Sequence, residues 1–137
     1  MKLKLLPRNW LVLQDLPDRG QRSEPFTVLS WNVLADGLAQ SQFYDRSAVV
    51  EWSFRSVRIR KEIKRLRADI VCLCEVNHFE DFFDPELGKM GYTAVAQQPR
   101  GAGMHSCVVF CRSRFELVKD LSFRGSCRQN AAVVWLR

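Results

Sequence analysis

The chain of 137 residues carries a formal net charge of +6, with 47% apolar and 11% aromatic residues. This length suits one compact domain, and the apolar content excludes a disordered chain. No stretch approaches the roughly 20 apolar residues that span a bilayer, so a membrane partner is not expected. The positive charge favours polyanionic partners such as nucleic acid or phosphorylated metabolites.

The amino-terminal segment is basic, because Lys2, Lys4 and Arg8 precede the first acidic residue, Asp15. It has no continuous apolar region followed by a small-residue cleavage site, so a secretory signal is not expected. We therefore expect an intracellular, cytoplasmic protein, and the basic start leaves a mitochondrial or nuclear location open.

Five cysteines leave one unpaired in any disulfide scheme. Cys72 and Cys74 are two positions apart in an apolar run and would point to the same face of a strand. We interpret all five as reduced thiols of an intracellular protein, several of them in the core. The alternative is a zinc site made of Cys72, Cys74 and His78, although this spacing is not one of the usual zinc patterns.

Proline and glycine punctuate residues 1–25, which we interpret as a lead-in to one domain over residues 26–137. This domain begins with a predicted buried strand at residues 26–32, which are rich in β-branched and aromatic side chains. Residues 35–48 are polar and predict a loop.

Residues 49–67 predict a helix. Its apolar stripe has spacings of seven, four and three, and consists of Trp52, Ile59, Ile63 and Leu66. Seven basic residues cover the remaining surface: Arg55, Arg58, Arg60, Lys61, Lys64, Arg65 and Arg67. Two interpretations of them stay open, a solvated helix face and a nucleic-acid-binding face, although the run lacks interleaved aromatic residues.

Continuous apolarity over residues 70–76 predicts a strand that is buried on both faces. A second helix is predicted over about residues 79–90, ending at Gly91. The order of strand, helix, strand and helix indicates a layered α/β arrangement. The second half is predicted to be mostly antiparallel, with a loop at 97–105 and strands at 92–96, 107–111, 115–121 and 131–136. Because the chain stops directly after the last of these strands, we expect a truncated domain.

Glu75 stands at the exit of an apolar strand, where a lone carboxylate is costly unless it is paired, hydrogen-bonded or bound to a cation. Strand ends in open α/β sheets form ligand sites, and Mg²⁺ takes one or two protein carboxylates together with waters and phosphate oxygens. A structural salt bridge is the alternative. Asn32 ends the earlier strand, and its amide suits either strand capping or contact with Glu75 or a phosphate. Adjacent parallel strands would place Asn32 and Glu75 side by side.

Several segments together resemble the endonuclease/exonuclease/phosphatase superfamily. Trp31–Ala35 (WNVLA) is similar to its first motif, and Leu73–Val76 (LCEV) to its second, with Cys74 in place of a glutamine. The helix between them follows the W-x-x-R-x-x-x-I-x-x-E-I pattern of nocturnin, Angel proteins and carbon catabolite repressor type deadenylases. Residues 77–92 and the strand pair at 107–118 also resemble that branch, which the chain matches over about residues 26–137.

This resemblance implies an α/β (α+β) fold, a four-layer α/β/β/α sandwich of which the chain holds the N-terminal half. It also implies a phosphoester hydrolase that uses Mg²⁺, with Glu75 as the metal ligand and Asn32 orienting the phosphate or supporting the metal shell. The implied substrates are poly(A) RNA, cleaved as by a 3′–5′ exoribonuclease, or a phosphorylated adenine dinucleotide. Related enzymes also use a later Asp-x-Asn pair and an Asp-His pair, and neither occurs in this sequence.

The sequence departs from the pattern of this branch at two places. Two other residues, His78 and Arg100, are candidates for substrate binding. Asn77 stands where the deadenylase-like proteins have Asp, and His105 with Ser106 replaces an Asp-Gly pair. His78 is predicted either to face the substrate or to pack beside neighbouring aromatic rings, and Arg100 to contact a phosphate or to be a surface arginine.

The alternative function is a catalytically inactive, truncated paralogue that acts as a binding module. One half of a sandwich leaves the apolar face of its sheet without a partner. We therefore expect self-association of the isolated chain.

Overall fold

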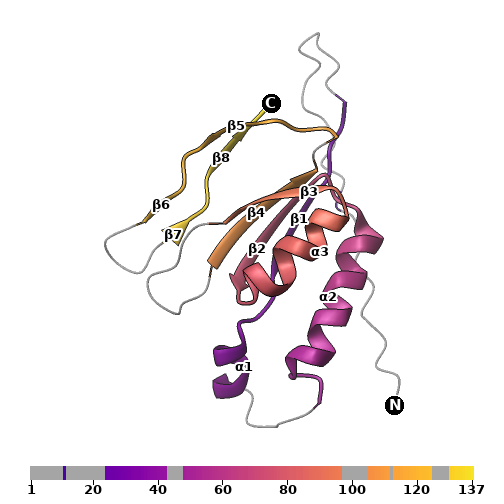
Figure 1. Cartoon of the computed structure of the whole chain (residues 1–137), viewed down its shortest axis with the longest axis vertical. Coiled ribbons are helices and arrows are strands. Elements are labelled where there is room, and N and C mark those ends of the chain that lie inside the picture. Colours follow the sequence, from indigo (N-terminus) through magenta and orange to yellow (C-terminus); the bar gives the residue numbers. More distant parts are fainter. Residues whose placement is uncertain (1–10, 12–23, 43–47, 97–104, 112, 125–129) are drawn as a thin grey trace.

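The computed structural model describes residue 11 and residues 24–42, 48–96, 105–111, 113–124 and 130–137. Its elements follow the predicted order of strand, helix, strand and helix before a mostly antiparallel second half (Figure 1). The helices are α1 (Asp36–Gln42), α2 (Trp52–Leu66), a π-helical turn η1 (Phe79–Phe83) and α3 (Asp84–Lys89). The strands are β1 (Val28–Asn32), β2 (Ile70–Val76), β3 (Tyr92–Ala96), β4 (His105–Cys111), β5 (Leu117–Asp120), β6 (Phe123–Arg124), β7 (Asn130–Ala131) and β8 (Val134–Leu136).

Strands β1 to β4 form one mixed sheet, in the spatial order β1-β2-β4-β3. β1 and β2 are parallel and are joined through α2, whereas β4 is antiparallel to both β2 and β3. The register places Asn32 at the end of β1 opposite Cys74, one residue before Glu75. The carboxyl ends of the two parallel strands therefore meet at one edge of the sheet, as predicted.

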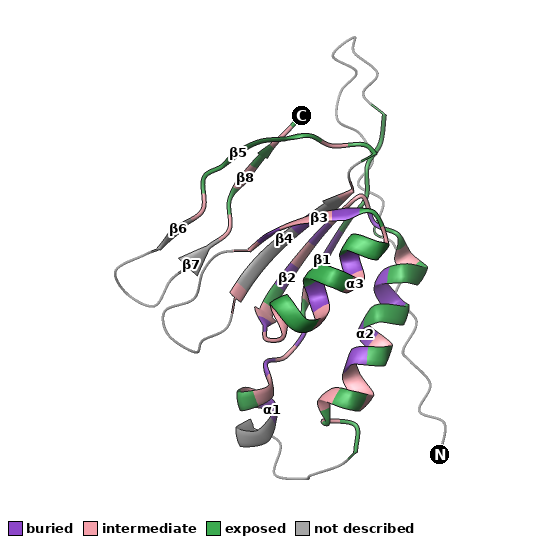
Figure 2. Ribbon diagram, in the orientation of Figure 1, coloured by how far each residue is buried: buried purple, intermediate pink, exposed green. Residues whose placement is uncertain are grey.

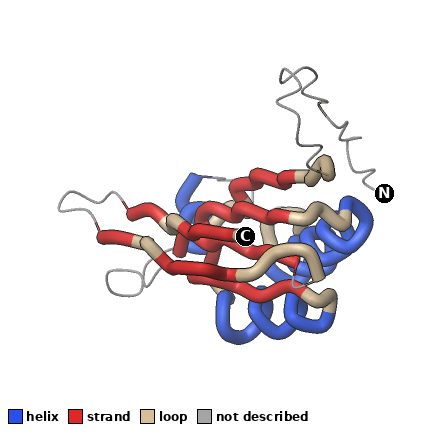
Figure 3. The backbone as a smooth tube through the Cα atoms, turned by 90° about the horizontal axis from the view of Figure 1, so that it is seen from above, coloured by secondary structure: helices blue, strands red, loops and turns tan. Residues whose placement is uncertain are grey.

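Helices α2 and α3 pack on one face of this sheet, and their inward sides are buried (Figures 2 and 3). Ile59 and Ile63 of the predicted apolar stripe are 5% and 1% exposed and join Val71 and Leu73 of β2 in one core cluster. Arg67 ends α2 in the left-handed conformation with φ 48°, and its backbone N–H donates to the Ile63 carbonyl.

The prediction that β2 is buried on both faces was wrong for the described residues. Val71 and Leu73 are buried beneath the helices, but Cys72 is half-buried and Cys74 is exposed on the opposite face. β1 alternates in the same way, with Leu29 buried between exposed neighbours. The reason is that α2 and α3 lie on the same side of the sheet, so only one face receives a helical layer.

Residues 35–48 were predicted to be a loop, but α1 occupies the start of this segment. Ala35 and Ala39 are 2% and 1% exposed, and the Ala39 N–H donates to the Ala35 carbonyl at 2.8 Å. The predicted helix at 79–90 is divided, because it begins with the π-helical turn and continues as α3. Gly91 follows with φ 87°, which agrees with its predicted role at the helix end.

Strands β5 and β8 form an antiparallel ribbon, which extends on the side of the sheet away from α2 (Figure 1). β6 and β7 continue it, so the predicted antiparallel pairing of the second half is confirmed. Apolar side chains on and beside the ribbon are exposed: Leu117, Val118, Leu121, Val133 and Trp135. Self-association of the chain through such surface stays a prediction.

The described cysteines, Cys72, Cys74 and Cys111, are free thiols, and none of them is fully buried. Their reduced state stays a prediction. Cys111 is half-buried and packs against the core, whereas Cys74 is exposed and does not have the predicted core position. Within the described ranges no helix is long and apolar enough to cross a membrane.

Tyr92 ties the first residue of β3 to the end of α2. Its hydroxyl donates to the Ala68 carbonyl at 2.7 Å, and both residues are buried. Replacement of Tyr92 by phenylalanine is expected to lower the free energy of unfolding by about 1 kcal/mol, because the buried carbonyl loses its donor. Chemical denaturation measures this change, and Ser53→Ala, which removes an exposed hydroxyl, is the control. Equal stability of Tyr92→Phe and the native chain would contradict the expectation.

Candidate functional site

The candidate site begins with a bulge in β2. Leu73 pairs with Cys107 of β4, but Val76 pairs with His105, so β2 has one more residue than its partner between these two pairs. Glu75 lies in this bulge with φ 56°, a left-handed conformation that non-glycine residues rarely adopt. A bulge redirects a side chain relative to its strand, and here it turns the carboxylate toward the end of β1.

Asn32 holds this carboxylate, as the parallel strand arrangement predicted. The Asn32 side-chain Nδ2 donates to Glu75 Oε1 at 2.5 Å, while its Oδ1 accepts from the Leu34 N–H at 2.9 Å. The Ala35 N–H lies 3.4 Å from Glu75 Oε2. The amide is therefore fixed at both ends, and Glu75 keeps acceptor capacity on Oε2 for a further ligand.

A second polar group lies beside the first turn of α1. The Asn77 Oδ1 accepts from the Asp36 N–H at 2.8 Å, which positions this helix start. Arg55 of α2 donates to the carbonyls of Val33 and Leu34 at 2.9 and 2.6 Å, and it also pairs with the Asp36 carboxylate. The chain between β1 and α1 is thus fastened to both α2 and the residues after β2.

His78 completes this group. Its Nε2 lies 2.9 Å from Asp36 Oδ2 and its Nδ1 lies 2.8 Å from Asp81 Oδ2. The imidazole stacks on the Trp52 ring at a centroid distance of 4.3 Å and an interplanar angle of 9°. With a carboxylate on each nitrogen, the ring is held as a double donor when it is protonated.

The two carboxylates raise the pKa of His78 above its usual 6.5. Partial burial alone would lower this pKa, but the hydrogen bonds and charges of Asp81 and Asp36 outweigh burial. The same contact lowers the pKa of Asp81, chiefly through its hydrogen bond with His78. The pair is therefore strongest when the imidazole is charged and the carboxylates are ionised.

A pH dependence of stability follows from the raised pKa of His78. A group whose pKa is higher in the folded state contributes stability that is fully present below its unfolded pKa of about 6.5 and is lost as pH rises through the folded pKa. We expect the free energy of unfolding to fall as pH rises above about 6.5, and His78→Gln to flatten that decline. Urea titrations at several pH values measure it, with His105→Gln as the control. A decline of the same slope in His78→Gln would contradict the assignment.

The structure brings Asn32 and Glu75 into contact, as predicted, and places His78 in the neighbouring group. The His78 ring packs on an aromatic ring, as one of its two interpretations predicted, and this ring is Trp52 of α2. The predicted phosphate contact Arg100 lies outside the described residues, and so does the 97–104 segment of the predicted loop. His105, predicted to be in that loop, is the first residue of β4.

Sequence reasoning missed Asp36 and Asp81 as partners of His78, and it placed Arg55 among solvated residues. The Arg55 side chain is only 11% exposed, so the solvated interpretation is wrong for this member of the basic run. Its place in the W-x-x-R pattern, three residues after Trp52, was the signal available. Asp36 gave none, because it is an isolated acidic residue in a segment predicted to be a loop. Asp81 stands beside Glu80 among phenylalanines, and nothing in that pattern singled it out as a partner of His78.

The donor set fits magnesium better than zinc. In the described part of the chain, no cluster of three or more His, Cys, Asp or Glu side chains could hold a metal ion, so the zinc alternative with Cys72, Cys74 and His78 is wrong. Magnesium needs fewer protein ligands, because waters and substrate phosphates complete its shell. Glu75, with one oxygen held by Asn32, supplies the single carboxylate that such a site requires.

Comparisons with known proteins agree with this arrangement. The model of the endonuclease/exonuclease/phosphatase family matches residues 29–134. Carbon catabolite repressor protein 4 homolog 6 of Arabidopsis thaliana is 35% identical over 123 residues, which cover 85% of this chain and 16% of that protein. The chain spans a minor part of this relative's length.

Two solved structures are similar as well. One is Angel2, a 2′,3′-cyclic phosphatase in complex with adenosine-2′,3′-vanadate, with a TM-score of 0.73 and 31% identity over 82% of this chain and 37% of that one. The other is the human nocturnin catalytic domain with a bound sulfate anion, with a TM-score of 0.60 and 31% identity over 73% of this chain and 37% of that one. The predicted fold of endonuclease/exonuclease/phosphatase type is thereby confirmed for the part that this chain contains.

Proposed function

The chain belongs to the endonuclease/exonuclease/phosphatase family, in the branch of the carbon catabolite repressor, Angel and nocturnin proteins, and we propose that it forms the metal-binding edge of a magnesium-dependent phosphoester hydrolase. The observation that carries this proposal is the bulged Glu75, whose carboxylate accepts a hydrogen bond from Asn32 at the meeting point of two parallel strands. A left-handed backbone at a glutamate is costly, and such strain is typical of functional sites.

The residues of this chain would have distinct roles at this site. Glu75 binds the cation through Oε2, and Asn32 holds the other carboxylate oxygen and so fixes the direction in which Glu75 points. When bound, magnesium polarises a phosphoryl oxygen and stabilises the negative charge that develops on it. The Arg55, Asp36 and His78 group keeps the β1–α1 connection in place beside this edge.

The proposed substrate is a phosphate ester that carries adenine, either poly(A) RNA or a phosphorylated adenine dinucleotide. This choice follows from the relatives, since carbon catabolite repressor type subunits are named 3′–5′ exoribonucleases and Angel2 is described with an adenosine-2′,3′-vanadate ligand. His78 is proposed to lie near the bound substrate, because its stacked ring is anchored three residues after Glu75.

Metal-dependent nucleotide binding tests the proposal. Two ligands, adenosine 3′-monophosphate and a 2′-phosphorylated adenine dinucleotide, are titrated calorimetrically into the 137-residue chain. Each titration is done once with Mg²⁺ in excess over the protein and once with excess EDTA. We expect binding that needs magnesium, with negligible turnover, because the sequence lacks the Asp-x-Asn and Asp-His pairs that position water in related enzymes. Equal binding in EDTA would contradict the metal role.

A binding module without chemistry is the second candidate. It is favoured by a specific observation, that Glu75 belongs to no group of three or more His, Cys, Asp or Glu side chains that could hold a metal ion among the described residues. This candidate expects ligand binding in EDTA and no effect of magnesium, so the same titrations separate it from the hydrolase.

A further inference from the structure

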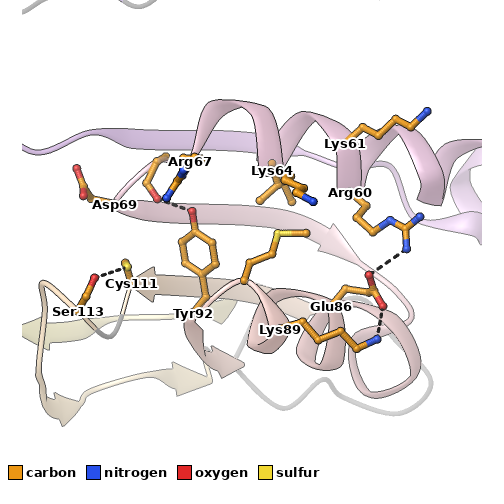
Figure 4. Close-up of a pocket in the computed structure, with 13 residues that line it drawn as sticks. Arg60, Lys61, Lys64, Arg67, Asp69, Glu86, Lys89, Tyr92, Cys111 and Ser113 are labelled. Atoms are coloured by element: carbon orange, nitrogen blue, oxygen red, sulfur yellow. Dashed lines mark hydrogen bonds and ion pairs between the residues drawn. The ribbon is translucent and has the colours of Figure 1, made fainter.

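A basic groove lies between α2 and α3, on the helical side of the sheet (Figure 4). It has a volume of about 830 Å³, with Tyr92, Met90 and Cys111 among its lining residues. Five basic side chains line it: Arg60, Lys61, Lys64, Arg67 and Lys89. We call this surface the α2–α3 groove.

Only two acidic side chains line the groove, and both are already engaged. Glu86 pairs with Arg60 at 3.2 Å and with Lys89 at 2.7 Å, and these cations lower its pKa. Asp69 accepts hydrogen bonds from Thr27 and Arg114. The groove therefore carries a net positive charge that its own carboxylates do not neutralise.

The uncompensated charge belongs to two side chains of α2 and to Arg67, which directly follows this helix. Lys61, Lys64 and Arg67 are exposed, and within the described ranges they form no ion pair. Their spacing of three residues sets them along one side of the helix, over a length of about 9 Å at 1.5 Å per residue. Cations near the carboxyl end of a helix also interact favourably with the helix dipole, which by itself accounts for Lys64 and Arg67. The dipole does not account for the groove beside these two side chains.

The groove is remote from the candidate metal edge. Asp69 and Arg67 precede the first residue of β2, whereas Glu75 lies near its other end. A seven-residue strand spans about 20 Å, so a ligand in the groove does not need to touch Glu75.

We propose that the α2–α3 groove binds the phosphate backbone of single-stranded RNA, as a second nucleic-acid contact separate from the Glu75 edge. Three adjacent cations can contact the phosphates of consecutive nucleotides, and neutralising these phosphates releases the counterions that drive such binding. Tyr92, the one aromatic ring among the described lining residues, is 7% exposed and donates its hydroxyl to the Ala68 carbonyl. It offers no platform for base stacking, so the contact reads the backbone and not the sequence.

Fluorescence anisotropy of a labelled single-stranded RNA of about 15 nucleotides tests the proposal, because this length covers the usual binding footprint of such surfaces. The titration is done in EDTA, so that a cation at Glu75 does not contribute. The double variant Lys61→Glu/Lys64→Glu is expected to bind at least ten times more weakly than the native chain. The slope of log affinity against log salt should fall by about 1.4, since each phosphate contact in a single strand contributes about 0.7. Lys64→Glu alone has a matched control in Lys119→Glu, which reverses the same charge on an exposed residue of β5.

The outcomes separate this proposal from the hydrolase proposal. Loss of RNA binding by the α2 variant in EDTA, where the Glu75 site has no cation to hold, with full binding by the control variant, supports the groove. An equal loss in Lys64→Glu and Lys119→Glu would mean that net charge alone drives binding, which overturns it. Stronger competition by an acidic peptide than by unlabelled RNA of equal charge would also overturn it. If the α2 variant misfolds, amide chemical shifts of the native chain decide, since RNA should perturb Lys61–Arg67 and Lys89 first.

Discussion

Replacement of Arg55 by alanine is expected to lower the free energy of unfolding by about 3 to 5 kcal/mol. This guanidinium is nearly buried, and it donates to the carbonyls of Val33, Leu34 and Val50 while pairing with Asp36. Its removal leaves three carbonyls without this donor and leaves His78 as the remaining side-chain partner of the Asp36 carboxylate. Equilibrium urea unfolding, followed by circular dichroism, measures the loss.

Two further variants test the physical reason. Lys61→Ala removes an exposed cation from the same helix and should change stability by less than about 0.5 kcal/mol. Arg55→Lys keeps the charge but not the planar fork of donors, so it should recover only part of the loss. An Arg55→Ala chain as stable as Lys61→Ala would show that these hydrogen bonds contribute little.

Replacement of Glu75 by glutamine is expected to reduce divalent cation affinity below detection, whereas Asn32→Ala should weaken it by about ten- to a hundredfold. Glutamine keeps the shape of the side chain and an oxygen that can accept from Asn32, but it removes the charge that attracts the cation. Asn32 touches the carboxylate and not the ion, so its loss frees Glu75 to rotate instead of removing a ligand. Electron paramagnetic resonance of Mn²⁺, used in place of Mg²⁺, measures the free ion in each titration.

Glu80→Gln is the matched control, because Glu80 is an exposed carboxylate five residues further along the chain. It should bind Mn²⁺ as the native chain does. Retention of affinity in Glu75→Gln, or an equal reduction in Glu80→Gln, would place the cation elsewhere. Unfolding curves of the three variants show whether any reduction reflects loss of the fold.

The sequence predicted the elements that depend on strong local patterns. The apolar stripe with Ile59 and Ile63 predicted α2, and the polar ends of two apolar strands predicted that Asn32 lies beside Glu75. These features follow from periodicity and from the geometry of parallel strands, which act over short distances or through one connection.

The features that sequence reasoning missed depend on contacts between distant residues. The start of α1 is fixed by Asn77, which is 41 residues away, and Arg55 is buried because it binds carbonyls more than 20 residues earlier. The bulge at Glu75 is a mismatch between two strands, so neither strand shows it alone. Which face of β2 is exposed depends on the side of the sheet on which α2 and α3 pack, and the apolar run of β2 does not specify that side.

The left-handed backbone at Glu75 also bears on how this chain would change under relaxed selection. Glycine, and to a lesser degree asparagine, adopts φ 56° more easily than glutamate does, by about 1 kcal/mol for glycine. Random substitution at position 75 therefore includes replacements that make the fold more stable while they remove the carboxylate. In a copy of this domain that had lost any need for a cation, stability would no longer oppose such replacements. The backbone conformation at position 75 therefore does not favour a glutamate over a glycine.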